Sequence, residues 1–137
     1  MKLIVCIDER GGLLFNKRRQ SRDRVLQERV LELCKGARLF LSPYSAKLFG
    51  EGEGICVSEA PFEEAGKDDF YFLEDKGYSL SDCQEVYLFN WNRHYPSDVT
   101  FPYDLKKEGY RRVSKTDFAG YSHEKITEEY FIKEKNK

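Results

Sequence analysis

The chain has 137 residues, of which 34% are charged, 40% are hydrophobic and 15% are aromatic, and its net charge is −1. This length and aromatic content predict one folded domain over residues 1–137 and exclude a disordered chain. No apolar run approaches the ~18 residues of a membrane-spanning helix, and the opening apolar run is too short for a signal peptide. We therefore expect a cytoplasmic protein with no membrane partner, whose four cysteines are reduced.

The first third of the chain predicts a strand followed by a helix. Lys2–Ile7 is a nearly continuous apolar run, typical of a strand that is covered on both faces, and a turn is expected at Gly11 and Gly12. Ser21 is the expected N-cap of a helix that runs to Lys35.

The rest of the chain predicts more strands, with one helical turn at Ser45–Phe49 and a polar connection, 114–127, before the last strand. Because helices separate the early strands but not the late ones, we expect an α/β domain with one mixed sheet, parallel in its core and closed by an antiparallel hairpin. The further strands are expected at Arg38–Leu41, Ile55–Ser58, Asp69–Leu73, Glu85–Asn90, Tyr110–Val113 and Glu129–Lys133.

Asp23 is placed unusually for a carboxylate. It lies three residues before Leu26 and seven before Val30, so it projects along the apolar stripe of the expected helix. Burial there would raise its pKa and keep it ready as a proton donor. The other interpretation is that an acid in the first turn only complements the helix dipole and assists the cap.

Charge is distributed unevenly along the chain. Residues 17–29 hold six basic and two acidic side chains, a net charge of +4, whereas residues 51–85 hold eleven acidic and two basic ones, a net charge of −9. The basic cluster stands at a helix N-terminus, which suits phosphate, so nucleic-acid binding is one candidate function. Trp91, Tyr95 and Tyr103 are candidates for stacking on bases. Two solvated surfaces would explain the same pattern. The basic cluster consists of Lys17, Arg18, Arg19, Arg22 and Arg24.

Several segments together resemble the dihydrofolate reductase family. An apolar strand ends in Asp8, a glycine turn and a loop follow, and Asp23 opens a helix. Later, Asp98-Val-Thr-Phe-Pro102 is similar to the family's Asp-x-x-Phe-Pro segment. The resemblance implies a dihydrofolate reductase-like sheet with a small-ligand pocket between the first strand and the helix. It also implies that the acid binds a ring amidine or protonates a heterocycle. We expect this pocket to be lined by Cys6, Phe15, Asp23 and Gln27, with Asp23 as the catalytic candidate.

The segments that would bind NADPH depart from the family pattern. Where the family has Gly-Arg-x-Thr, this chain has Ser42-Pro-Tyr-Ser45, and where it has Gly-Gly, this chain has Glu74-Asp75. Two acids bring bulk and negative charge to a place where bare backbone would approach a pyrophosphate. The connection between Ser58 and Glu85 is also short for the family. We therefore expect no cofactor and no NADPH-dependent reduction.

Two further enzyme classes find little support. Short chains that open in this way also look like small uncharacterised bacterial proteins labelled ribonuclease Z. That label implies a two-zinc hydrolase with many histidines. This chain has two isolated histidines, His94 and His123, both expected in surface loops, so no metal site is expected. The sequence contains no Gly-x-Ser-x-Gly motif, so no nucleophilic serine of that type is predicted. The sequence thus favours small-ligand binding near Asp23, with nucleic-acid binding as the alternative.

Overall fold

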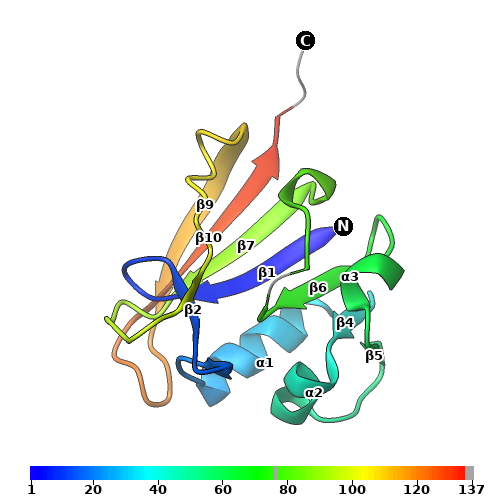
Figure 1. Ribbon diagram of the computed structural model, residues 1–137, viewed down its shortest axis with the longest axis horizontal. Coiled ribbons are helices and arrows are strands. Elements are labelled where there is room, and N and C mark those ends of the chain that lie inside the picture. Colours follow the sequence, from blue (N-terminus) through cyan, green and yellow to red (C-terminus); the bar gives the residue numbers. More distant parts are fainter. Residues whose placement is uncertain (76, 135–137) are drawn as a thin grey trace.

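The computed structural model of the protein describes residues 1–75 and 77–134 and is built around a seven-stranded sheet (Figure 1). Two neighbours of the central strand are parallel to it, and the last two strands form an antiparallel hairpin at one end of the sheet. The predicted mixed sheet is confirmed. In spatial order the strands are β5 (Ile55–Val57), β4 (Leu39–Leu41), β6 (Phe70–Leu73), β1 (Lys2–Ile7), β7 (Glu85–Asn90), β10 (Ile126–Lys133) and β9 (Tyr110–Phe118).

Helices occupy the connections between the early strands, as predicted. No helix in the described part of the chain is long and apolar enough to cross a membrane. Between β5 and β6 the chain forms only a four-residue helix, in agreement with the short connection expected from the sequence. The helices are α1 (Arg24–Leu33), α2 (Pro43–Phe49), α3 (Pro61–Glu64) and the 3-10 turn η1 (Leu80–Asp82).

The central strand β1 is covered on both faces, which explains its continuous apolar run. Leu3 and Val5 point into one core cluster, and Ile4 points into the cluster on the opposite face. The second cluster contains Leu26 and Val30 of α1, so this helix packs its predicted apolar stripe on the sheet. Alternation along the strand therefore divides one hydrophobic segment between two cores.

The main difference from the prediction lies in the polar strands. β9 and β10 are longer than expected and extend through about half of the stretch predicted as a connection, because their pairing does not require apolar residues at an exposed edge. A second, three-stranded sheet was not predicted at all. Its strands are β3 (Arg18–Arg19), β2 (Gly12–Phe15) and β8 (Val99–Thr100).

Asp8 fixes the end of β1 to the loops around it. Its carboxylate is fully buried and accepts backbone N–H groups from Gly12 at 2.8 Å, Arg10 at 2.9 Å and Tyr95 at 3.0 Å, and the Gln20 side-chain amide at 3.2 Å. Burial alone would raise the pKa of Asp8, but these donors outweigh burial and leave the pKa below its ordinary value. One carboxylate thus satisfies polar groups from three separate segments.

Replacing Asp8 with alanine should therefore destabilise the fold by about 3 kcal/mol, since several donors would lose their shared acceptor in a buried place. Urea unfolding of Asp8→Ala measures this loss. Glu9→Ala, an exposed acid one residue away, is the matched control and should stay within about 0.5 kcal/mol of the wild type. Equal stabilities of the two variants would contradict the role assigned to Asp8.

Candidate functional site: a buried Asp–His–Ser network beside a narrow cleft

Asp23 is the N-cap of α1. Its Oδ1 accepts the backbone N–H groups of Val25 at 2.9 Å and Leu26 at 3.3 Å, so the helix begins at Arg24. The prediction of Ser21 as the cap is wrong, because the loop backbone places Asp23, two residues later, at the helix start. The capping interpretation of Asp23 is confirmed.

The same carboxylate also binds the loop that precedes β10. It accepts the N–H groups of Tyr121 and Ser122, both at 2.9 Å, and pairs at 2.8 Å with Nδ1 of His123. A Cβ on Gly120 would lie 2.6 Å from Oδ2 of Asp23, so this close approach requires glycine. Helix and loop, about a hundred residues apart in sequence, are therefore held together by one side chain.

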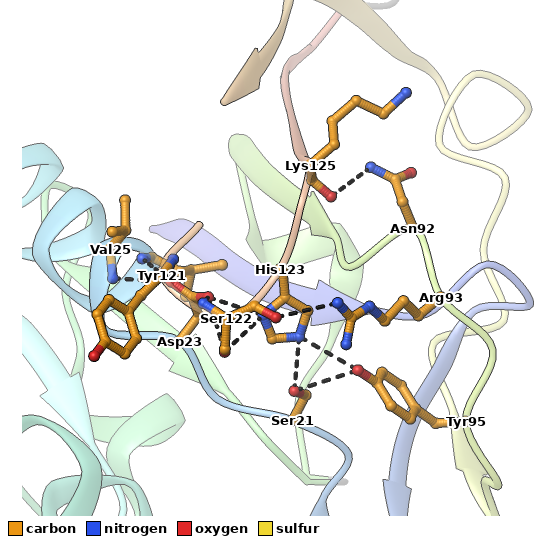
Figure 2. Close-up of polar contacts among 11 residues, drawn as sticks. Ser21, Asp23, Val25, Asn92, Arg93, Tyr95, Tyr121, Ser122, His123 and Lys125 are labelled. Atoms are coloured by element: carbon orange, nitrogen blue, oxygen red, sulfur yellow. Dashed lines mark hydrogen bonds and ion pairs between the residues drawn. The ribbon is translucent and has the colours of Figure 1, made fainter. Parts of the chain in front are cut away.

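His123 continues the network on its other side. Its Nε2 lies 2.9 Å from Oγ of Ser21 and 3.3 Å from the hydroxyl of Tyr95, while its ring stacks on Trp91 with the ring centroids 4.6 Å apart. Figure 2 shows the imidazole between Asp23 on one side and the two hydroxyl groups on the other. The expectation of a surface histidine is wrong, since His123 is only 3% exposed. Its sequence neighbours are polar and gave no sign of burial.

The expected proton-donor state of Asp23 is not what the structure provides. Burial raises the pKa of Asp23, but the Tyr121 N–H, the His123 ring and the Ser122 N–H oppose it. Together they hold the pKa far below the ordinary aspartate value. The carboxylate therefore stays ionised, and it suits orientation of the imidazole better than donation of a proton.

A second buried carboxylate stands at the end of β6. Glu74 is 8% exposed and forms a two-pronged ion pair with Arg19, at 2.7 Å and 3.0 Å, and it accepts a hydrogen bond from Ser45 at 2.7 Å. The Arg19 guanidinium also lies over the Tyr44 ring, 4.3 Å from its centroid. The ends of β4 and β6 are thereby closed by an internal charge pair.

A narrow cleft lies between these two networks. Its walls include Cys6, Asp23 and Gln27, as predicted, whereas Phe15 is 42% exposed and lines a separate shallow groove on β2. The cavity in the cleft has a volume of about 20 Å³, which is room for about one water molecule. Gln27 belongs to the cleft wall, and its Nε2 is buried and has no hydrogen-bond partner in the described structure. Burial raises the pKa of the Cys6 thiol well above its ordinary range, so that thiol stays neutral.

The predicted basic cluster is divided in the structure. Arg19 is committed to Glu74, and Arg24 lies over the Tyr121 ring at 4.2 Å. Lys17, Arg18 and Arg22 are exposed, the first two at the β2–β3 turn.

The three aromatic residues considered for base stacking differ in exposure and do not form one surface. Trp91 is 4% exposed and therefore cannot stack on a base. Tyr103 is exposed, while the hydroxyl of Tyr95 points to His123. Within residues 1–75 and 77–134, no group of three histidine, cysteine or acidic side chains is arranged to hold a metal ion.

The arrangement of strands, with its parallel core and terminal hairpin, defines a dihydrofolate reductase-like fold. The chain is similar to a dihydrofolate reductase from Enterococcus faecalis, solved with NADP(H) and RAB-propyl. The TM-score is 0.65 with 12% sequence identity, over 98% of this chain and 96% of that one. At this identity the likeness shows the fold. No protein-family model and no curated protein matches the sequence.

The low pKa of Asp23 predicts how stability depends on pH. A carboxylate whose pKa is lower in the folded state stabilises the fold above its unfolded-state pKa, near 4, and loses this effect as the pH falls further. Asp23→Asn should therefore cost about 3 kcal/mol at pH 7 and progressively less between pH 4 and pH 2. Chemical unfolding of both proteins across this range measures the difference. A constant difference would contradict the assignment.

The Arg19–Glu74 pair predicts a strong coupling. Arg19→Met leaves Glu74 buried without its cation and should cost about 3 kcal/mol, whereas the double variant Arg19→Met/Glu74→Gln should recover more than half of that loss. A double-mutant cycle in urea measures the coupling energy. The exposed pair Arg112 and Glu129, joined at 3.0 Å, is the matched control and should give less than about 1 kcal/mol.

Proposed function

We propose that this protein binds a small heterocyclic ligand in the cleft beside Asp23 and does not reduce it with NADPH. The observation that carries the proposal is Gln27, which lines a cleft at the carboxyl ends of β1 and β6 and whose buried Nε2 has no hydrogen-bond partner in the described structure. Such strand ends are the usual ligand position in open α/β sheets. A buried amide N–H without a partner favours a ligand that offers a ring nitrogen or carbonyl oxygen.

The polar group that meets the ligand is Gln27 rather than Asp23. Both oxygens of Asp23 already accept hydrogen bonds, Oδ1 from three backbone N–H groups and Oδ2 from Ser122 and His123. A ring amidine would have to displace one of these donors. Asp23 therefore supports the cleft wall by holding α1 and the loop in place.

The position of Glu74 supports the proposal that the protein does not carry out NADPH-dependent reduction. A dinucleotide phosphate needs exposed N–H groups or free cations. At the end of β6 it would instead meet a buried carboxylate whose nearby cation, Arg19, is already paired. The end of β4 passes through Ser42 directly into Pro43, which has no N–H to offer. Both positions disfavour a phosphate.

Nucleic-acid binding through residues 17–24 is the second candidate. Exposure of Lys17, Arg18 and Arg22 favours it. The pairing of Arg19 and the stacking of Arg24 on Tyr121 reduce the free charge, and the buried Trp91 removes one stacking surface. The exposed cations alone would give weak binding that depends strongly on salt.

A thermal-shift experiment tests these functions together. The probes are a pteridine such as folate, a diaminopyrimidine antifolate, NADPH, and a short single-stranded RNA, each at two salt concentrations. We expect the melting temperature to rise with a heterocycle and to stay unchanged with NADPH. Because bound ligand stabilises the folded state by mass action, a concentration of 100 Kd should add about 2.7 kcal/mol.

Variants locate the binding. Gln27→Met keeps the side-chain length but removes the amide, so it should abolish most of the shift, while Phe15→Leu, outside the cleft, should keep it. A rise in melting temperature with NADPH would contradict the proposal that the protein does not use NADPH. A salt-sensitive shift with RNA alone, or no shift with any heterocycle, would contradict the proposed ligand site.

A further inference from the structure

We infer that Ser21, His123 and Asp23 form a catalytic triad that hydrolyses a small carboxylic ester in the cleft. This activity goes beyond ligand binding and does not depend on the heterocycle proposed above. Nothing in the sequence around Ser21 predicts it, because the three residues come together only in the fold. Residues 21 and 23 precede and begin α1, whereas His123 belongs to the loop before β10 (Figure 2).

The two hydrogen-bond distances around His123 match those that activate a nucleophilic hydroxyl group. Oγ of Ser21 lies 2.9 Å from Nε2 of His123, and Nδ1 lies 2.8 Å from Oδ2 of Asp23. Both fall within the range of nucleophile, base and orienting acid. The ionised Asp23 favours the tautomer with hydrogen on Nδ1, which leaves Nε2 as the acceptor for the Ser21 proton. Geometry and charge therefore assign one role to each residue.

The imidazole is held in one orientation. The side chain of His123 is 1% exposed, and its ring stacks on Trp91, so rotation out of the network would cost this packing. The hydroxyl of Tyr95 also faces Nε2 but lies farther away, at 3.3 Å. Ser21, not Tyr95, lines the cleft, so Ser21 is the group that a substrate can meet.

A side-chain amide in the cleft wall is the candidate donor for the oxygen that becomes charged. Gln27 lies in the first turn of α1 and lines the same cleft as Ser21. Its buried Nε2 has no partner in the described structure. Preorganised N–H donors of this kind stabilise the oxyanion of an acyl-transfer intermediate. Because the cavity is narrow, the ester used to probe it carries the short acetyl group.

The reaction balances with water as the second reactant. Ser21 Oγ attacks the ester carbonyl carbon while its proton moves to Nε2 of His123. The C–O bond to the alcohol breaks, and the leaving oxygen takes that proton. Water then attacks the acyl carbon and gives a proton to His123. The bond between this carbon and Oγ of Ser21 breaks, the carboxylic acid leaves, and the proton moves from His123 back to Oγ. No oxidant, reductant or metal takes part.

The test is covalent labelling. The protein is treated with a small fluorophosphonate, and the adduct is followed by intact mass and placed by peptide mapping. We expect one adduct, on Ser21, and hydrolysis of p-nitrophenyl acetate above the buffer rate. Ser21→Ala and His123→Gln should each lower the hydrolysis rate about 100-fold or more and abolish the adduct. Ser114→Ala, on the exposed face of β9, is the matched control and should behave as the wild type.

A second variant keeps the inference falsifiable if Ser21→Ala folds poorly. In Ser21→Cys, His123 should promote alkylation of residue 21 by iodoacetamide, and adding His123→Gln should slow it at least tenfold. No adduct on the wild type, or an adduct that persists in Ser21→Ala, would overturn the triad. A thermal shift with a heterocycle but no labelling would support the ligand site and contradict the triad. Labelling of Ser21 without a thermal shift would support the triad and contradict the ligand site.

Discussion

The ionised carboxylate of Asp23 is the interaction on which the contact between α1 and the loop before β10 depends. It caps α1, holds the loop before β10 through two backbone N–H groups, and fixes the His123 ring. These partners come from opposite ends of the chain, so the carboxylate brings the early parallel part of the fold and the late hairpin together. Its low pKa follows from this role, because the donors act only on the charged form.

Three buried carboxylates have similar surroundings: those of Asp8, Asp23 and Glu74. Each carboxylate is buried, and each is surrounded by its own set of donors or by a cation. The negative charge at the carboxyl ends of the parallel strands is therefore neutralised internally. This arrangement is the reason for proposing a neutral ligand and no binding of a dinucleotide phosphate.

The sequence was sufficient for the parts of the fold that depend on apolar pattern. The run Lys2–Ile7, the stripe Leu26 and Val30, and the strand Glu85–Asn90 all predicted elements that the structure contains. The small β2–β3–β8 sheet escaped prediction because its strands have two to four residues and too little periodicity to detect.

The site was harder to predict for a different reason. Asp23 was found from its position on a helix face, but its pKa depends on N–H groups that lie about a hundred residues away. His123 stands among polar neighbours and looked exposed, because its burial comes from contact with Trp91 and Asp23 rather than from its own segment. Local sequence contains no record of such contacts, so only the fold could reveal the Ser21–His123–Asp23 network.

The two end strands of the sheet differ in length and charge. Unpaired N–H and C=O groups along an end strand invite a strand of another molecule, and aggregation follows where that strand is long and apolar. Here β9 is long, but most of its residues are exposed and several are charged, whereas β5 at the opposite end has only three residues. The charged side chains of β9 and the short length of β5 both disfavour pairing with a strand of another molecule. The apolar centre of the sheet is therefore compatible with resistance to fibril formation.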